Sequence, residues 1–395
     1  MAINDMTVEQ SNTILAGVLS QAQGGAAVTT PTNAADFVTV AQTALKTGYD
    51  TLSTALSQVL SRTIFAVRPY NRRFQILERS AIEYGNHVRK VNYVDGALEQ
   101  NPAYTLTDGY SVDMYTVKKP KAVQTNFYGK NTFAYHQTVY KKQLKMSLRG
   151  PEEWNGFLGG LMTHVNNLME KTHEESARLT IANLIGGIVL TDTALSGANK
   201  NVIHLVTEYN AYSGQSLTPT TVFNPTNYPA FARWFFGRLK TASQQMAERS
   251  QLFHTNLTAG TFQRQSAVED QRLIMLAPMV NQLDTEVLST TYNAEYLRTI
   301  PREEIAYWQN IADPMKINTT ASYLKADGTI DTGSASISDV VAVLFDRDAA
   351  GYTMIDARYE VAPYNVAGQY YNHWWSFEDR YYNDFTENAI VFCLD

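Results

Sequence analysis

Residues 150–187, GPEEWNGFLGGLMTHVNNLMEKTHEESARLTIANLIGG, decide the fold, because they predict one long amphipathic helix. Pro151 followed by Glu152 and Glu153 is typical of a first helical turn, where carboxylates lie at the positive end of the helix dipole. Gly186 and Gly187 are expected to end the helix. At about 1.5 Å per residue it would span roughly 50 Å. A helix of this length is expected to cross an extended, flat subunit from one end to the other.

One side of this helix is expected to face the core. Apolar and small side chains recur there at steps of three and four residues. The expected stripe consists of Trp154, Leu158, Leu161, Val165, Leu168, Thr172, Ser176 and Leu179.

The composition is that of an ordinary soluble globular protein. The chain has 395 residues, of which 44% are hydrophobic and 18% are charged, so it is long enough to bury a large core. Its single cysteine, Cys393, excludes an intramolecular disulfide and a zinc site that needs several cysteines. No apolar stretch is long enough for a membrane span, and no basic leader precedes an apolar block. We therefore expect neither a membrane segment nor a signal peptide.

The charges are unevenly distributed. Residues 62–149 carry 15 Lys and Arg against 6 Asp and Glu, whereas residues 150–395 carry 16 against 28. The basic segment could bind an anionic polymer, or it could contact the acidic part of another copy of the chain. A solvated mixed surface is the third interpretation. The formal net charge of −6 argues against nucleic-acid binding by the whole chain.

The basic segment has the pattern of a β-ribbon that faces solvent on both sides. Apolar and polar residues alternate over 73–78 and 88–94, and a second strand-like stretch covers 117–128. Pro120 and the neighbouring lysines suit an edge strand that must avoid random pairing. Because an isolated ribbon has little core of its own, we expect it to be stable only when it is docked on something else.

The chain before the ribbon is expected to form an arm and a helix. Residues 21–31 are rich in Gln, Ala, Gly and Thr and can bury little apolar area, so they predict an arm or linker. Residues 37–60 have apolar side chains at helical spacing. They predict one long helix, or two helices that are separated near Gly48.

The chain after the long helix predicts an α+β fold. It has no repeated βαβ units, so a doubly wound nucleotide-binding fold is not expected. Residues 190–227 are polar and loop-like apart from a strand-like stretch at 202–206. The other expected elements are a helix over 228–247, a strand over 273–277, a helix from Pro278, and strands over 340–345 and 386–393.

Motifs that carry chemistry are mostly absent. The chain has no GxxxxGK[ST], GxGxxG or GxSxG sequence. Ala177 stands where a metalloprotease motif beginning at His173 needs its second histidine, so His164 and His173 are expected to be structural. Glu174 and Glu175, next to Glu170, could form an acid/base pair, although a solvated surface is the simpler interpretation.

Two smaller features receive structural interpretations. Asp346 and Asp348 flank Arg347 in an expected turn; they could hold a cation, but stabilisation of the turn is favoured. Cys393 lies in an apolar strand, where packing is favoured over nucleophilic chemistry. We expect no catalytic residue, no metal and no cofactor.

Aromatic residues are dense near the end of the chain. Such density is typical of a core or a subunit interface, and a stacking platform for sugars or bases is the alternative. The residues are Tyr364, Tyr370, Tyr371, Trp374, Trp375, Phe377, Tyr381, Tyr382 and Phe385. Tyr370, Tyr371, Trp374 and Trp375 are the candidates for interface or core contacts.

Along the chain, the expected elements are an arm and helix, a basic β-ribbon, a long helix, and an α+β part that ends in a strand. This order resembles the major capsid protein of tailed bacteriophages, which has the Hong Kong 97-type fold. The resemblance is closer to short-tailed phages of the phi twenty-nine type. Its carriers are residues 264–278 with 279–288, and residues 345–351 together with 364–375. The resemblance covers residues 225–395 well and the rest by the order of the elements.

The resemblance implies an α+β subunit with five parts. Residues 1–62 would form an N-terminal arm and helix, and residues 63–148 would form an extended loop and the start of the peripheral domain. Residues 149–227 would form the spine helix and peripheral domain. Residues 228–345 would form the axial domain, and residues 346–395 would return to the peripheral domain.

The resemblance also implies a function. The chain would assemble as hexamers and pentamers into an icosahedral or prolate head shell, in the host bacterial cytoplasm, and enclose double-stranded DNA. Expected partners are further copies, a scaffolding protein, a portal protein and decoration or head-fibre proteins, with no membrane. Contacts between subunits are expected at Arg72, Arg73, Arg89, Lys90, Lys118, Lys119 and Lys121.

Two other functions stay open at this point. A polyanion-binding module would use the same basic residues together with Arg68 and Arg79. It predicts an affinity for DNA that falls steeply with salt. An enzyme such as a glycan hydrolase would use Glu174 and Glu175, and substitution of those residues would abolish turnover.

Overall fold

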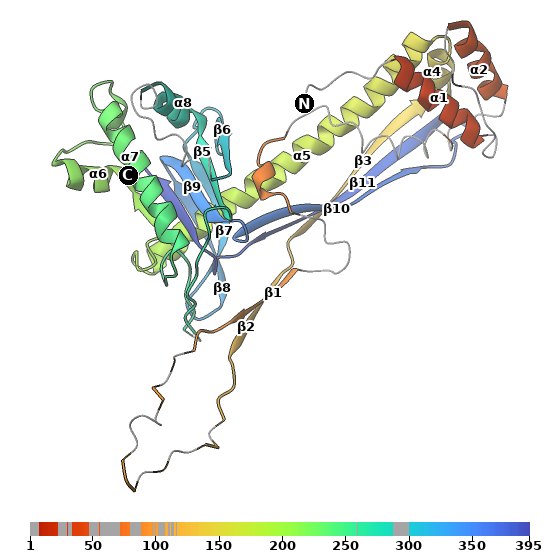
Figure 1. The fold of residues 1–395 in the computed structure, drawn as a ribbon. Helices are drawn as coiled ribbons and strands as arrows, with labels where there is room; N and C mark the ends of the chain where they lie inside the picture. Colours follow the sequence, from red (N-terminus) through yellow and green to blue (C-terminus); the bar gives the residue numbers. More distant parts are fainter. Residues whose placement is uncertain are drawn as a thin grey trace.

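A long helix, α5 (Pro151–Ala194), crosses the subunit and connects its two ends, as a computed structural model of the chain shows (Figure 1). Three short helices gather at its N-terminal end: α1 (Val8–Ala22), α2 (Ala34–Lys46) and α4 (Lys141–Ser147). The structure describes residues 8–22, 30, 34–46, 55, 72–79, 88–96, 98, 100, 101, 107–109, 111, 114, 115, 117–258, 260–286 and 300–395.

Helix α5 has 44 residues and continues past Gly186 and Gly187, so the predicted end was wrong. The two glycines instead face the hairpin of β7 (Ile317–Leu324) and β8 (Ile330–Ile337). A Cβ atom on Gly186 would lie only 2.6 Å from Cγ2 of Thr319. The glycines therefore let the hairpin approach the helix backbone closely.

The predicted apolar stripe holds only for part of α5. Trp154 and Val165 are buried, but Leu179 is 50% exposed. The C-terminal half is instead buried through Ala177, Ile181, Leu184 and Ile188. This half meets the rest of the subunit on a different side of the helix. The β7–β8 hairpin and the five-stranded sheet that is described below pack on that side.

A three-stranded antiparallel sheet runs along α5. Its order is β10 (Ala350–Val361), β11 (Tyr370–Asn383) and β3 (Lys130–Tyr140). Alternate residues of β11 are buried: Tyr371, His373, Trp375, Phe377 and Asp379. Trp375 and Phe377 join Trp154 and Val165 of α5 in one apolar cluster, so this face of the sheet packs on the helix.

The other end of the subunit is built on a five-stranded sheet. Its order is β4 (Val202–His204), β12 (Ala389–Cys393), β9 (Val340–Asp346), β5 (Gln271–Leu276) and β6 (Arg302–Ile305). All residues of β9 are buried, because one face packs against helices and the other against α5 and the β7–β8 hairpin. The helices are α6 (Leu205–Ser213), α7 (Tyr228–Ala247) and α8 (Ala277–Glu286).

The N-terminal helices pack on the first half of α5. Leu15, Val18 and Leu19 of α1 and Phe37 of α2 are buried in the cluster that contains Trp154. Helix α1 was not predicted. The expected linker lies almost entirely outside the described residues, as does Gly48, where two helices were expected to separate.

Several other predictions can be compared with the structure. Helix α7 has the predicted bounds, and strands β5, β9 and β12 lie within the predicted stretches or extend them by one or two residues. Residues 73–78 do not form a strand, because Gln75–Leu77 form a 3-10 helix. The stretch at 202–206 is a strand only to His204, where α6 begins, so residues 190–227 are more ordered than predicted.

Candidate assembly surfaces

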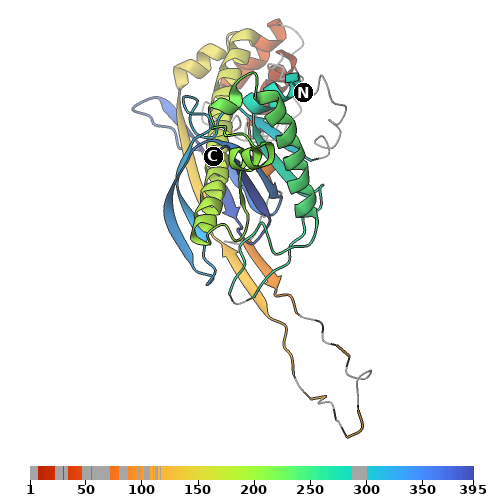
Figure 2. The same cartoon turned by 90° about the vertical axis from the view of Figure 1, so that its left-hand side faces the viewer.

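A two-stranded antiparallel ribbon leaves the body of the subunit and projects away from it (Figures 1 and 2). Its strands are β1 (Val88–Tyr93) and β2 (Ala122–Phe127), paired from Val88 with Phe127 to Tyr93 with Ala122. The structure confirms the predicted ribbon over these residues. We use "the ribbon" for the described residues 88–96 and 117–127.

The ribbon has two different faces. Residues paired across the strands share a face, and successive residues alternate between faces. Lys90 and Asn92 lie on the face toward the body, and Asn92 is buried. Arg89, Val91 and Tyr93 lie on the opposite face, where Val91 is 47% and Tyr93 is 70% exposed. The outward face therefore presents apolar side chains as well as a basic one.

Exposed apolar side chains continue beyond the paired strands. Leu98, Met114, Tyr115 and Val117 are each at least 78% exposed. Lys118, Lys119 and Lys121 follow them and are exposed as well. Exposed apolar groups accompanied by charges are typical of a surface that another molecule covers.

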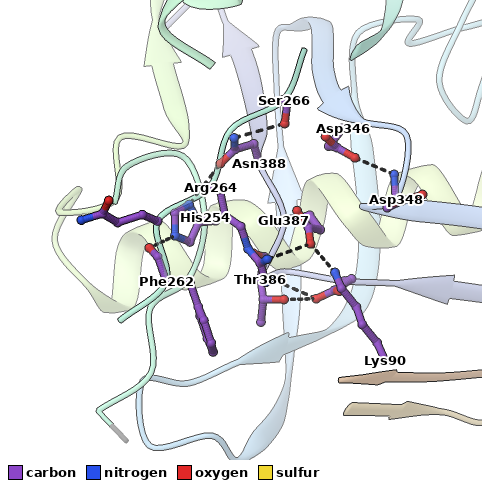
Figure 3. Close-up of polar contacts among 12 residues, drawn as sticks. Lys90, His254, Phe262, Arg264, Ser266, Asp346, Asp348, Thr386, Glu387 and Asn388 are labelled. Atoms are coloured by element: carbon purple, nitrogen blue, oxygen red, sulfur yellow. Dashed lines mark hydrogen bonds and ion pairs between the residues drawn. The ribbon is translucent and has the colours of Figure 1, made fainter. Parts of the chain in front are cut away.

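At its base the ribbon is held by charge. The Lys90 ammonium group forms an ion pair with the carboxylate of Asp384 and another with that of Glu387 (Figure 3). Burial lowers the pKa of Lys90, but the two carboxylates outweigh burial, so that its pKa is raised and the ammonium form is retained. Arg264 binds the same turn: its Nη1 lies 3.5 Å from Oε1 of Glu387, and its Nε donates to the Thr386 carbonyl at 2.9 Å.

A second group of contacts lies at the outer end of β1. The Asp95 carboxylate accepts a hydrogen bond from Arg249 Nη2 at 2.7 Å and another from the Gln263 backbone N–H at 2.7 Å. The Val94 side chain packs directly against Gly260, where a Cβ atom would lie 2.4 Å from Cγ1 of the valine. The loop over 249–264 therefore fits closely against the ribbon.

The predicted contact residues fall into two groups. Arg72 is 6% exposed, and it binds Glu170 at 3.0 Å and Glu78 at 2.7 Å. Arg72 and Lys90 thus bind acidic groups of their own chain. The side chains of Arg73, Arg89, Lys118, Lys119 and Lys121 are exposed.

The segment that contains Arg72 connects α5 to β6. The Glu303 carboxylate accepts hydrogen bonds from the backbone N–H groups of Phe74 and Ile76. Burial raises the pKa of Glu303, although these two donors oppose the shift. The Arg73 backbone N–H donates to Glu174 at 3.1 Å.

The candidate carboxylates on α5 have structural partners. Glu174 binds Arg178 at 2.8 Å, and Glu175 lies 3.6 Å from Lys171 on the surface. Arg178 also donates to the carbonyl of Trp308 at 2.9 Å and covers the ring of Phe74. Each carboxylate therefore has a basic partner one helical turn away, which is the expected pattern of a structural surface.

The two histidines of α5 also make structural contacts. His173 is buried, its Nδ1 lies 3.0 Å from Oδ1 of Asp379 on β11, and it also contacts the Tyr352 hydroxyl on β10. Burial raises the pKa of Tyr352, and Asp379 adds to that shift. His164 Nε2 lies 3.1 Å from the Tyr135 hydroxyl.

No metal centre is found in the described part of the chain, where no three His, Cys, Asp or Glu residues could surround an ion. Asp346 Oδ1 accepts from the Asp348 backbone N–H at 2.8 Å, so this pair stabilises its turn as predicted. None of the helices formed by described residues combines the length and apolar content that crossing a membrane requires.

The four aromatic candidates divide according to the alternation of β11. Trp375 is buried against α5. Tyr371 is buried as well, and its ring lies beside that of Tyr364, with ring centroids 4.9 Å apart. Trp374 is 40% exposed and stacks on His136 of β3, with ring centroids 4.6 Å apart. Tyr370 also lies on the outward face, where its ring meets the edge of Tyr140. Half of this set therefore belongs to the core, and half lies on the outward face of the sheet.

The sequence did not point to the residues that hold the ribbon on the body. Asp384, Glu387, Arg264 and Arg249 carry no local pattern that separates them from other charged residues of the acidic part. They become recognisable only when the turn at 384–388 and the loop at 249–264 are brought to the ribbon.

Comparisons with known proteins agree with this architecture. Residues 11–393 match the model of a family described as Phi29-like phage major capsid protein. No curated protein sequence matches the chain. A chain of the capsid structure of Staphylococcus phage Andhra is 11% identical, with a TM-score of 0.51 over 82% of this chain and 84% of that one.

A second solved structure is similar, from an assembly described as head fiber and inner core protein gp22 of native bacteriophage P68. It is 11% identical, with a TM-score of 0.52 over 82% of this chain and 85% of that one. At this identity the two structures show the fold alone, which is HK97-like. The family match covers almost the whole sequence. The chain therefore belongs to the Phi29-like phage major capsid proteins of tailed phages.

Proposed function

We propose that this capsid protein builds the closed head shell around double-stranded DNA, and that the ribbon is the part that clasps a neighbouring copy. The supporting observation is the contrast along the ribbon. Its base is bound to its own chain, whereas its outward face and the residues beyond it expose apolar and basic side chains. Because a two-stranded ribbon alone is marginally stable in water, a neighbour would stabilise it.

Charge complementarity supports a neighbour of the same kind. Residues 62–149 are basic and residues 150–395 are acidic. A contact between two different surfaces of the same subunit leads to rings when the rotation closes. We propose hexamers and pentamers on this basis, with Arg73, Arg89, Lys118, Lys119 and Lys121 at the contacts.

We propose the following division of the subunit. The five-stranded sheet and its helices, chiefly residues 228–345, would form the axial domain around the five-fold and six-fold axes. Helix α5 and the β10–β11–β3 sheet would form the peripheral domain. Strand β12 pairs with β9 and β4, so the end of the chain belongs with the five-stranded sheet.

We propose further partners, because the role of this protein is to enclose DNA in a shell and not to catalyse a reaction. A scaffolding protein would guide assembly in the host cytoplasm, and a portal protein would occupy one vertex. Head-fibre or decoration proteins would bind outside. The exposed pair of Trp374 and His136 lies on the outward face of its sheet and is available for such contacts.

The test reverses the three ribbon lysines, Lys118, Lys119 and Lys121, to Glu. We expect a folded subunit that no longer forms shells when it is expressed with its scaffold and viewed by electron microscopy. The matched control reverses Lys142, Lys145 and Lys171, which are exposed on α4 and α5, and it should assemble. Shells of wild-type shape and yield from the ribbon variant would remove the role proposed for the ribbon.

The same samples test the polyanion-binding alternative. If the isolated subunit bound DNA with an affinity that falls steeply with salt, and the ribbon variant lost that affinity, the basic segment would serve nucleic acid. We expect weak DNA binding that is the same in both triple variants.

A further inference from the structure

We propose that Lys90 is a positioning residue, and that its ion pairs with Asp384 and Glu387 set the direction in which the ribbon leaves the subunit. This inference rests on the proposed clasping role of the ribbon, because the direction of the ribbon then fixes the angle between neighbouring copies. Lys90 would thereby control the curvature and uniformity of the shell.

The first supporting observation concerns the backbone. In the described residues, β1 pairs only with β2, and no main-chain hydrogen bond joins either strand to the body. The bond from the Val94 N–H to the Lys121 carbonyl lies within the ribbon itself. Sheet hydrogen bonding therefore does not orient the ribbon, and side chains must do so.

The second observation is the position of the contacts. Lys90 binds the body near the middle of β1, and Asp95 binds it just beyond the end of that strand. A single point of attachment would let the ribbon pivot, whereas two separated points define a line. The charges at the Lys90 point are largely shielded from water, which strengthens their attraction, whereas Arg249 at the second point is exposed.

The third observation is that both contacts end on one connected surface. We call it the platform: loop residues 249–258 and 260–264, the turn over 384–388, and Ala389 at the start of β12 (Figure 3). Main-chain bonds join its parts, from the Thr255 N–H to the Phe385 carbonyl at 2.8 Å and from the Ala389 N–H to the Phe253 carbonyl at 2.8 Å. Arg264 crosses the platform to reach Thr386 and Glu387.

The buried ring of His254 makes the platform more rigid. Its Nε2 lies 2.9 Å from the Phe262 carbonyl oxygen, and its Nδ1 lies 3.0 Å from Oδ1 of Asn388. One imidazole thus connects the loop to the turn that carries Glu387. A movement of the ribbon would therefore break contacts to the platform before it distorted the platform.

The fourth observation identifies a pivot. The ribbon joins the β10–β11–β3 sheet through Tyr128 and Gly129, between the end of β2 and the start of β3. The Gly129 carbonyl accepts from the Tyr381 N–H at 3.2 Å. A Cβ atom at residue 129 would lie 2.4 Å from the Tyr381 carbonyl oxygen, so the backbones touch there. On the ribbon side of this point, the Phe127 ring still packs on Tyr382 of β11, with ring centroids 5.2 Å apart. The rest of β2 makes no main-chain hydrogen bond to the described residues of the sheet, so a change in the direction of the ribbon would turn about this base.

The Lys90 contact fixes the direction of the ribbon more strongly than the Asp95 contact does. Lys90 is the most buried of the ribbon's basic side chains. Its side chain is 24% exposed, whereas that of Arg249, which holds the second point, is 57% exposed. Removing the Lys90 ammonium group leaves Asp384 without its cation and leaves Glu387 with the more distant Arg264 alone, so that the two carboxylates lie close together with less positive charge between them. These carboxylates then repel each other, and the ribbon loses its fixed direction.

The test substitutes Lys90→Met, which keeps an unbranched side chain one atom shorter than that of lysine and removes the charge. Arg89→Met is the matched control, because it removes the same charge from the outward face of the next residue. Spin labels at Ala122→Cys, which pairs with Tyr93 on the outward face of the ribbon, and at Ser216→Cys on the body report the direction of the ribbon by double electron–electron resonance. The unassembled full-length subunit is measured.

For wild type and Arg89→Met we expect one narrow distribution of distances between the labels. For Lys90→Met we expect loss of that single population, with an unchanged circular dichroism spectrum and shells of mixed size or open tubes. Asp384→Asn with Glu387→Gln should reproduce this result from the other side of the ion pairs. A narrow, unshifted distribution in Lys90→Met would overturn the inference.

The two ideas fail separately. If the triple lysine variant of the ribbon assembled normally, the clasping role would be lost while the spin-label result could still stand. If Lys90→Met kept the wild-type distance but the triple lysine variant failed to assemble, the ribbon would clasp its neighbour without being oriented by Lys90.

Discussion

Gly187 of α5 lies directly against the ring of Phe385. A Cβ atom on this glycine would be 2.4 Å from Cζ of the ring and 2.9 Å from the Ser322 carbonyl oxygen. The contact brings the long helix, the β7 strand and the turn that carries Glu387 to one point. The glycine that resembles a helix stop is therefore a packing position inside the helix.

Gly187→Ala should destabilise the subunit. Alanine favours a helix interior by about 1 kcal/mol, but overpacking costs about 1–3 kcal/mol, so we expect a net loss of about 1 kcal/mol. Gly156→Ala is the control in the same helix, because no described atom lies within 4 Å of its added Cβ. That variant should gain about 0.5–1 kcal/mol. Denaturant unfolding of both unassembled variants is the measurement, and equal gains would contradict the close packing.

Elements that depend on a pattern within their own sequence were predicted well. Features that depend on contacts between distant elements were not. Helix α7 and strand β9 follow from local periodicity, and both have their expected positions. The end of α5 depends on the β7–β8 hairpin, more than 120 residues later in the chain. Residues 73–78 alternate like a strand, but the Glu303 carboxylate binds the N–H groups of two of them and favours a 3-10 turn.

Arg72→Met should strongly destabilise the subunit, because it leaves Glu170 buried without its cation. Breaking a buried pair costs about 3–5 kcal/mol. Arg72→Met combined with Glu170→Met should recover much of the loss. Arg302→Met is the control: its pair with Glu304 is one-third exposed, so we expect a change of about 0–1 kcal/mol. A loss of similar size in both single variants, measured by denaturant unfolding, would argue against a special role for the Arg72 pair.

The basic segment could be found from the sequence, but the roles of its members could not. Lys118, Lys119 and Lys121 are exposed, and they were grouped with Arg72 and Lys90 because all five are basic and near in sequence. Burial separates them, and burial depends on which acidic groups the fold brings near. The partners of Lys90 lie almost 300 residues later, where no local pattern points to them.

Acid should destabilise the subunit through His373. Burial lowers the pKa of this histidine from 6.5 to about 4, and its ring contacts the Tyr359 hydroxyl. Between these two pH values the unfolded chain binds a proton that the folded chain excludes. Stability contributed by the neutral ring is therefore complete above pH 6.5 and falls as the pH drops to about 4, by up to about 3 kcal/mol.

The control for this pH dependence is His373→Gln, which can still accept from Tyr359 but does not titrate. The free energy of unfolding of both proteins is measured from pH 7 to pH 4. Other acid-sensitive groups contribute equally to both curves, so the difference isolates His373. Parallel curves would show that the ring titrates as it does in the unfolded chain.

The thiol of Cys393 should be unreactive until the subunit opens. The residue is 2% exposed in β12, where its strand pairs with β9 and β4, and burial raises its pKa to about 12. Only the thiolate reacts with a disulfide reagent such as dithionitrobenzoate. At pH 8 we therefore expect slow labelling of the native protein and immediate labelling in denaturant. Cys393→Ser combined with Ser216→Cys places a thiol on an exposed loop and should react at once. Rapid labelling of the native wild type would mean that β12 separates from the five-stranded sheet in the unassembled subunit.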